Sequence, residues 1–312
     1  MNARVLNVFE LFSGIDQFFR FQTRPVEGAE LAAQLRLDHP MLTMVMKRGG
    51  AVPEVVYPFD SAGSRHALGD AVPWALAIAI PRISEEPDVL FDELIDRVER
   101  APRATLAQHY RVIFDWLTER SGRSCWVERS GTSIEFLQEL HAFFPDARFV
   151  HIHRDGREAA LSMREYAVLR VAVAVMNGLV GEIEYSHEGL TRLERERPEA
   201  IDALLAARPP VELYGKYWSD QILRGEQVLA ELPAERFHTI RFEELVTRPA
   251  AVLAEVSDFL ELPDDPGFIE RASALSNGMP RLRWGELSSA DRDALDAACA
   301  GAMRSLGRVE GD

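Results

Sequence analysis

An alternation of strand and helix patterns over residues 124–162 constrains the fold more than any other feature of the sequence. Short β-type runs at Ser124–Glu128 and Arg148–His153 each lead into a segment with the apolar spacing of a helix. The first of these helices is expected over Ser133–Phe144, where Pro145 ends it. Strand, helix, strand and helix joined by short links are typical of a parallel sheet covered by helices.

Later segments extend this pattern. A third strand is expected over Arg236–Arg241, and a helix follows it over residues 249–260. A long charged helix is expected over residues 182–207 and a closing helix over Ser289–Leu306. The predicted fold class is therefore α/β, with a central parallel sheet flanked by helices.

The first third of the chain is less regular. Residues 53–73 are rich in turn-forming residues, and only Val89–Arg100 and Ala104–Thr118 have helical periodicity. We therefore expect two parts. Residues 1–104 form a helical subdomain or a lid, and residues 105–312 form the α/β core.

Composition limits the partners of the chain. A net charge of -15 over 312 residues argues against nucleic acid and anionic membranes, because such ligands require a basic surface. Any small anion must then be held by a few arginines and by backbone N–H groups. The two cysteines, Cys125 and Cys299, have no metal-site spacing. No apolar run is long enough to span a bilayer, so a cytoplasmic location is expected.

The turn after the second strand is the best candidate for an anion site. Asp155 and Glu158 have the spacing of a capping box for the helix that follows, whereas Arg154 has no such role at the carboxyl end of its strand. Ser162 lies two turns further along the same face. An arginine and a hydroxyl thus flank one anion-sized site, unless Arg154 pairs with a surface carboxylate and Ser162 is simply solvated.

This region resembles a known family. The runs Cys125–Ser130 and Phe144–Ser162 look like the strand–helix–strand core of sulfotransferases that use 3'-phosphoadenosine 5'-phosphosulfate (PAPS). Those segments read approximately W-V-E-K-S/T-P and F-P-D-A-R-F-I-x-x-x-R-D-P-R-D-x-x-x-S in the family. The resemblance implies a sulfotransferase fold, similar to that of P-loop NTPases, and a 3'-phosphate bound by Arg154 and Ser162. Gly156 stands where the family usually has proline.

Two weaker matches follow. Arg241–Pro249 is similar to the family's R-Y-E-D-L-x-x-x-P, with Phe242 in place of tyrosine, and Arg281–Trp284 resembles the basic and tryptophan-containing segment that closes over the nucleotide. Arg281 and Trp284 are therefore further candidate nucleotide ligands. The resemblance covers about residues 105–307.

One departure is serious. The family's N-terminal phosphate loop, a strand followed by K/R-S-G-T-T or K/R-S-G-T-S, holds the 5'-phosphosulfate, and the nearest counterpart here is Phe12–Asp16, without the basic residue. Three explanations stand open: a segment before Met1 is lost, the site is degenerate, or another loop replaces it.

Arg129–Ser133 is a candidate for that other loop. It reads R-S-G-T-S between a strand and a helix, so Ser130, Gly131, Thr132 and Ser133 are candidate cofactor ligands. Two observations argue against this assignment: the first favours a structural role, and the second, which we prefer, favours a place next to the acceptor. Thr132 and Glu135 have the spacing of a capping box, and the position matches the family's acceptor-side strand end.

Catalysis would require a base for the acceptor's proton and cations for the developing negative charge. Glu128 and Arg129 are the candidates, and Glu128 could equally be a structural carboxylate. The predicted function is sulfuryl transfer from PAPS to a hydroxyl or amine of a small molecule or glycan, without a metal.

Two other classes of function compete with this prediction. A degenerate sulfotransferase-like protein would bind a nucleotide or a partner without catalysis. A metal-dependent hydrolase is suggested by His151 and His153, which share one face of a strand, although only His238 offers a further ligand.

Overall fold

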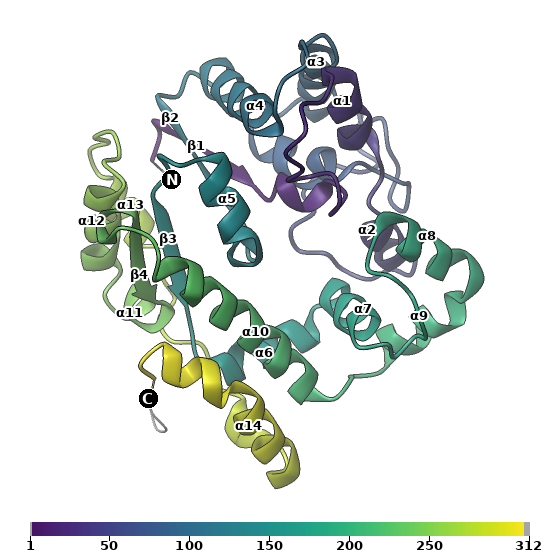
Figure 1. Cartoon of the computed structure of the whole chain (residues 1–312), viewed down its shortest axis with the longest axis vertical. Coiled ribbons are helices and arrows are strands. Elements are labelled where there is room, and N and C mark those ends of the chain that lie inside the picture. The colour runs from purple at the N-terminus through teal and green to yellow at the C-terminus, as the bar shows by residue number, and fades with distance from the viewer. Residues whose placement is uncertain (1, 309–312) are drawn as a thin grey trace. The chain divides into compact units, whose positions relative to one another are not determined.

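The computed structural model describes residues 2–308, in two compact units that are each built from separate stretches of chain (Figure 1). The N-terminal unit comprises residues 6–131 and 166–208. The C-terminal unit comprises the residues up to 5, residues 132–165 and the residues from 209 onward. This division differs from the boundary after residue 104 that the sequence suggested.

The N-terminal unit combines one two-stranded sheet with helices. β1 (Val5–Phe9) pairs with β2 (Cys125–Arg129). The helices are α1 (Gly28–Arg36), α2 (Pro40–Met46), α3 (Pro87–Glu99), α4 (Leu106–Arg120), α7 (Ala167–Met176), α8 (His187–Glu196) and α9 (Pro198–Ala206). Short turns of 3-10 and π-helix lie at Phe12–Gly14, Ala75–Ala79 and Ile80–Arg82.

Helix α4 shows how local sequence builds this unit. Thr105 accepts a hydrogen bond from the Gln108 backbone, and the Gln108 side chain accepts one from the Thr105 N–H, which completes a capping box. Tyr110 and Phe114, one turn apart, are then fully buried. Both rings pack edge-on against Phe12, with centroids 5.0 and 5.7 Å away. Phe12 is therefore a core residue.

The C-terminal unit contains the parallel pair of strands. β3 (Phe149–His153) and β4 (Phe237–Arg241) run parallel, with Phe149 opposite Phe237 and His153 opposite Arg241. The helices are α5 (Leu137–Phe143), α6 (Gly156–Glu165), α10 (Val211–Leu229), α11 (Phe242–Thr247), α12 (Pro249–Phe259), α13 (Phe268–Ser273) and α14 (Ser289–Ser305). 3-10 turns lie at Ser133–Phe136, Ala234–Arg236 and Trp284–Glu286.

Small residues let helices pack closely in this unit. α10 packs against both α6 and α14. A Cβ atom at Gly156, the first residue of α6, would lie 2.3 Å from the ring of Trp218 on α10. A proline carries a Cβ and does not fit there. The contact with Trp218 therefore explains why this chain has glycine at position 156 instead of the proline in the family pattern.

The α/β class predicted from the sequence is confirmed, with the strands of the described chain in two two-stranded sheets. Strands β2, β3 and β4 and helices α12 and α14 lie within a few residues of their predicted bounds. The prediction of one long helix over residues 182–207 is wrong. It divides into α8 and α9 because Pro198 supplies no N–H and begins a new helix. No helix in residues 2–308 has the length and apolar character needed to cross a membrane.

Candidate functional site

The turn between β3 and α6 places Arg154 and Asp155 directly after the last strand residue, His153. The Asp155 carboxylate accepts a hydrogen bond from the Arg157 backbone N–H at 2.8 Å and also pairs with the Arg157 guanidinium. Burial would raise the pKa of Asp155, but its contacts with Arg157 hold that pKa below its ordinary value. Asp155 therefore caps α6 as predicted.

Glu158 does not complete the predicted capping box. Its side chain is only 4% exposed, and its Oε1 atom accepts hydrogen bonds from the backbone N–H groups of Arg283 and Trp284 at 2.7 and 2.8 Å. The Asp155 N–H donates instead to Glu243. The predicted role of Glu158 in the capping box is thus wrong. Glu158 instead attaches the Arg281–Trp284 segment to α6.

Arg154 is half-buried beside other charges. Its guanidinium lies 5.5 Å above the Phe242 ring, and within residues 2–308 no hydrogen bond or ion pair reaches that guanidinium. Burial lowers the pKa of Arg154, Glu158 opposes this shift, and the positive charge of Arg283 adds to it. The carboxylates of Glu243 and Asp155 also act on Arg154, and Arg283 lies 3.7 Å from Glu158. None of these carboxylates forms an ion pair with Arg154 in the described chain, so a hydrogen-bonding anion would still be a partner for this guanidinium.

The other predicted nucleotide ligands lie in different surroundings. Ser162 is exposed on α6. The Arg281 side chain is 81% exposed and pairs with Glu286 at 2.6 Å. Trp284 is half-buried, with the Arg157 guanidinium 4.7 Å from its ring. The neighbour of Arg154 from this segment is Arg283, which sequence reasoning passed over because spacing does not indicate which of two nearby arginines turns inward.

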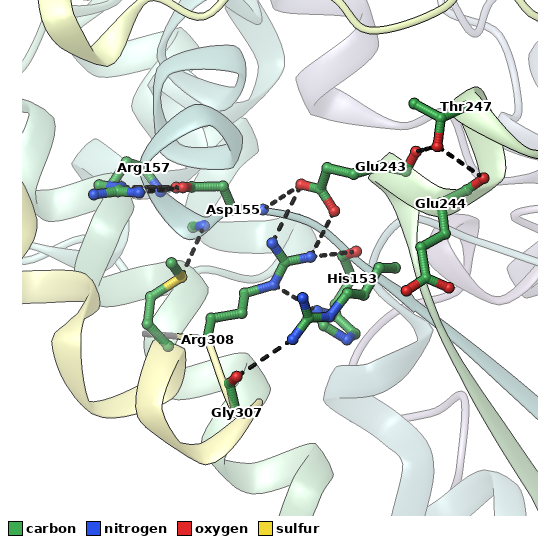
Figure 2. A network of polar contacts seen from close by, with 11 residues as sticks. His153, Asp155, Arg157, Glu243, Glu244, Thr247, Gly307 and Arg308 are labelled. Carbon is green, nitrogen blue, oxygen red and sulfur yellow. Dashed lines mark hydrogen bonds and ion pairs between the residues drawn. The ribbon is translucent and has the colours of Figure 1, made fainter. Parts of the chain in front are cut away.

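A polar network supports the Arg154 turn (Figure 2). Arg308, only 3% exposed in its side chain, donates to Nδ1 of His153 at 3.1 Å and to Glu243 at 2.7 Å. Glu243, at the start of α11, in turn accepts the Asp155 N–H at 3.1 Å. Burial would raise the pKa of Glu243, but the hydrogen bond from Arg308 holds that pKa below its ordinary value. Arg308, three residues after the end of α14, therefore contacts both β3 and α11.

The predicted catalytic residues belong to the N-terminal unit. Glu128 is half-buried on β2, and the guanidinium of Arg129 lies 4.3 Å from the Phe9 ring. After β2, the backbone N–H of Gly131 donates to the carboxylate of Glu10 at 3.2 Å.

The rest of the predicted loop begins a 3-10 turn. Ser130, Thr132 and Ser133 are half-buried, and this turn starts at Ser133. The Thr132 side chain does not cap the turn, so the capping box predicted with Glu135 is wrong. Glu135 instead donates its backbone N–H to the Thr132 carbonyl.

A family model described as "Sulfotransferase family" matches residues 79–210 and 203–266, more than half of the chain. The chain belongs to the sulfotransferase family. Among solved structures, it is similar to the sulfotransferase domain from the curacin biosynthetic pathway, with 14% identity over 99% of both chains and a TM-score of 0.43. No curated protein sequence matches it.

Two further solved structures are similar to the chain. One is the sulfotransferase domain of the Synechococcus PCC 7002 olefin synthase, with 15% identity, 99% of this chain and 96% of the other covered, and a TM-score of 0.41. The other is sulfotransferase STF9 from Mycobacterium avium, with 15% identity, 89% and 66% covered, and a TM-score of 0.40.

The segment that follows β1 packs partly into the core. Phe12 is buried, and a Cβ atom at Gly14 would lie 2.4 Å from Cβ of Trp74. The residue directly after the strand is Glu10, an acid. Phe12–Asp16 lacks the basic residue of a phosphate loop, and in the structure two of its five residues, Phe12 and Ile15, are buried in the core.

The two histidines that suggested a metal hydrolase have other contacts. Their ring centroids are 5.5 Å apart, as expected for one face of β3. Nδ1 of His153 accepts a hydrogen bond from Arg308, and Nδ1 of His151 lies 3.6 Å from Glu226. Residues 2–308 contain no group of three or more His, Cys, Asp or Glu side chains placed to hold a metal ion.

Proposed function

We propose that this sulfotransferase transfers a sulfuryl group from PAPS to a hydroxyl or amine of a small molecule or glycan. The observation that carries the proposal is Arg154, a half-buried guanidinium that no hydrogen bond or ion pair reaches within the described chain. Charged side chains are seldom buried without a partner. A phosphate group supplied by a ligand would be that partner.

The 3'-phosphate is proposed to bind mainly through side chains. The backbone N–H groups of Asp155 and Arg157 already donate to Glu243 and Asp155. The Gly156 N–H faces the sulfur of Met303, a weak acceptor, at 3.4 Å. Arg154, Arg283 and Ser162 would therefore supply most of the contacts. Trp284, held to α6 through Glu158, would offer its ring to the nucleotide.

The chemical step is proposed to follow the usual balance of sulfuryl transfer. The acceptor oxygen or nitrogen forms a bond to sulfur, the bond from sulfur to the phosphate oxygen breaks, and adenosine 3',5'-bisphosphate leaves. Glu128 is proposed to take the acceptor's proton, and Arg129 to stabilise the charge that develops on the transferred group. Ser130, Gly131, Thr132 and Ser133 form the proposed loop beside that group.

Nucleotide binding tests this proposal. Adenosine 3',5'-bisphosphate should raise the melting temperature, and adenosine 5'-monophosphate should do so much less, because only the first carries a phosphate for Arg154. At about 100 times its dissociation constant, a ligand of the native state adds about 2.7 kcal/mol of stability. Equal shifts from the two nucleotides would show that the 3'-phosphate is not recognised.

A non-catalytic, nucleotide-binding role is the second candidate. The packing after β1 favours it, because Phe12 is buried, Gly14 lies against Trp74, and the segment lacks the basic residue of a phosphate loop. Transfer of label from sulfur-labelled PAPS to simple phenols, alcohols and amines separates the two. Binding of adenosine 3',5'-bisphosphate without any labelled product would support the non-catalytic role.

A further inference from the structure

Glu10 adopts a backbone conformation that is unusual for its residue type. Its φ angle is +54°, in the left-handed region that residues other than glycine seldom occupy. The backbone is held on both sides: its N–H donates to the Arg129 carbonyl at 3.0 Å, and its carbonyl accepts from Nε1 of Trp74 at 2.7 Å. Such strain persists where surrounding contacts determine the conformation, and it often accompanies a functional role.

The result of this conformation is a contact between a carboxylate and a backbone donor. Oε1 of Glu10 accepts a hydrogen bond from the Gly131 N–H at 3.2 Å. Gly131 is exposed, and the atom nearest to the position of a Cβ there is the same Glu10 oxygen, at 3.8 Å. The loop after β2 thus already donates to an anion, and the chain itself supplies that anion.

Two arginines lie beside this contact. The guanidinium groups of Arg82 and Arg129 are 4.6 and 4.3 Å from the centroid of the Phe9 ring, next to Glu10 in sequence. Arg82 donates to the backbone carbonyls of Glu54 and Ile78. No hydrogen bond or ion pair reaches the guanidinium of Arg129 within residues 2–308. The positive charges of the two guanidinium groups repel each other, and both attract the Glu10 carboxylate.

The carboxyl group of Glu10 is poorly stabilised as an anion. Burial raises its pKa, and the neighbouring carboxylate of Glu54 adds to this, while the Gly131 N–H, Arg129 and Arg82 act in the opposite direction. The hydroxyl of Tyr166 also faces this group, and it donates to Glu54 at 2.5 Å. The ionised Glu10 side chain is therefore held less firmly than its hydrogen bond alone suggests.

We propose that the Gly131 N–H, Arg82 and Arg129 form a binding site for a small tetrahedral oxyanion, and that the Glu10 carboxylate occupies this site until such a ligand displaces it. A backbone N–H and guanidinium groups are the donors that bind sulfate and phosphate in proteins. The inference stands independently of the proposed nucleotide. Where the proposed function also holds, the oxyanion is the phosphosulfate end of the donor.

Sulfate binding to two variants of equal charge tests the proposal. Glu10→Asn and Glu54→Gln each remove one negative charge, but only the first frees the Gly131 N–H, and asparagine tolerates a left-handed backbone. Glu54→Gln keeps an acceptor for Tyr166. Affinity is measured by titrating sodium sulfate and following the amide resonance of Gly131. Glu10→Asn should bind sulfate about tenfold or more tightly than the wild type, and Glu54→Gln should bind it within about threefold of the wild type.

The pH dependence of sulfate affinity is a second, independent test. Sulfate affinity of the wild type should rise as pH falls, because protonation of Glu10 removes the competing charge, whereas the affinity of Glu10→Asn should change little. The double variant Glu10→Asn/Arg129→Ala should lose the increase in sulfate affinity that Glu10→Asn alone produces. Should Glu10→Asn fold poorly, Glu10→Gly removes the same carboxylate and accepts the same φ.

Equal sulfate affinity in the Glu10 and Glu54 variants would overturn the proposal, since the effect would then be one of net charge. An undiminished gain in the double variant would also overturn it. Nucleotide binding is measured separately. If Glu10→Asn binds sulfate more tightly but the protein binds no nucleotide, only the proposed function is contradicted. If the protein binds nucleotide but Glu10→Asn gains no sulfate affinity, only this inference is contradicted.

Discussion

Asp155 and Arg154 are adjacent in the chain but differ in the partners that the fold provides. Asp155 is fully engaged, because it caps α6 and pairs with Arg157. Arg154 has the ring of Phe242 beneath it and charged neighbours on several sides, yet within the described residues no hydrogen bond satisfies it. Asp155 thus completes the local structure, and Arg154 is the residue that we propose contacts the 3'-phosphate.

Replacement of each residue by alanine should separate these roles. Arg154→Ala should lower the affinity for adenosine 3',5'-bisphosphate at least tenfold, because a charge-assisted contact is worth about 1.5 to 3 kcal/mol, and should barely change stability. Asp155→Ala should cost about 1 kcal/mol of unfolding free energy through the lost cap and affect binding less. Calorimetric titration and urea unfolding of both variants measure the two effects. If Arg154→Ala is the less stable variant and binds nucleotide normally, Arg154 is a structural residue.

At the scale of elements, the sequence predicted the strands around the site better than the contacts between them. β3, β4 and α6 follow from local patterns, so Arg154 could be placed at a strand end without a structure. Glu158 could not be assigned, because a carboxylate three residues after Asp155 matches a capping box in sequence, whereas its actual partners lie more than 120 residues away. Arg308 and Glu243 were missed for the same reason.

The attachment of the Arg281–Trp284 segment to α6 can be tested by removing Glu158. Glu158→Ala should leave the N–H groups of Arg283 and Trp284 without their acceptor, which costs about 1 to 3 kcal/mol for a buried group. Trypsin should then cleave after Arg281 and Arg283 several times faster than in the wild type, and nucleotide affinity should fall.

Glu286→Ala is the matched control for that experiment. It removes a carboxylate two residues after the segment but breaks only the exposed pair with Arg281, which is worth about 0 to 1 kcal/mol. Equal cleavage rates in the two variants would mean that Glu158 does not hold the segment.

At the scale of the whole molecule, the limits of sequence reasoning lie in the long-range assembly. β1 was not predicted, because Asn7 interrupts its short apolar run, yet it pairs with β2 from more than 100 residues later. Each compact unit combines stretches that are distant in sequence. Local periodicity carries no information on such pairings.

Buried histidines lie in both units, and they should make the protein sensitive to acid. Burial lowers the pKa of His39 to about 3 and the pKa of His151 and His153 to about 4. For His153, Arg308 adds to this effect, because its positive charge faces Nδ1. Burial raises the pKa of Glu10 and of Glu226, which offsets part of the effect.

The free energy of unfolding should therefore fall as pH decreases from about 6.5 toward 4. In that range the unfolded chain, whose histidines titrate near 6.5, binds protons that the folded protein excludes. Urea unfolding at pH 7.5, 6 and 5 measures the slope. His153→Gln keeps an oxygen that can accept from Arg308 but cannot be protonated, so its slope should be shallower by up to about 1.4 kcal/mol per pH unit, the limit for one proton. An unchanged slope in this variant would show that His153 is protonated in the folded protein as readily as in the unfolded chain.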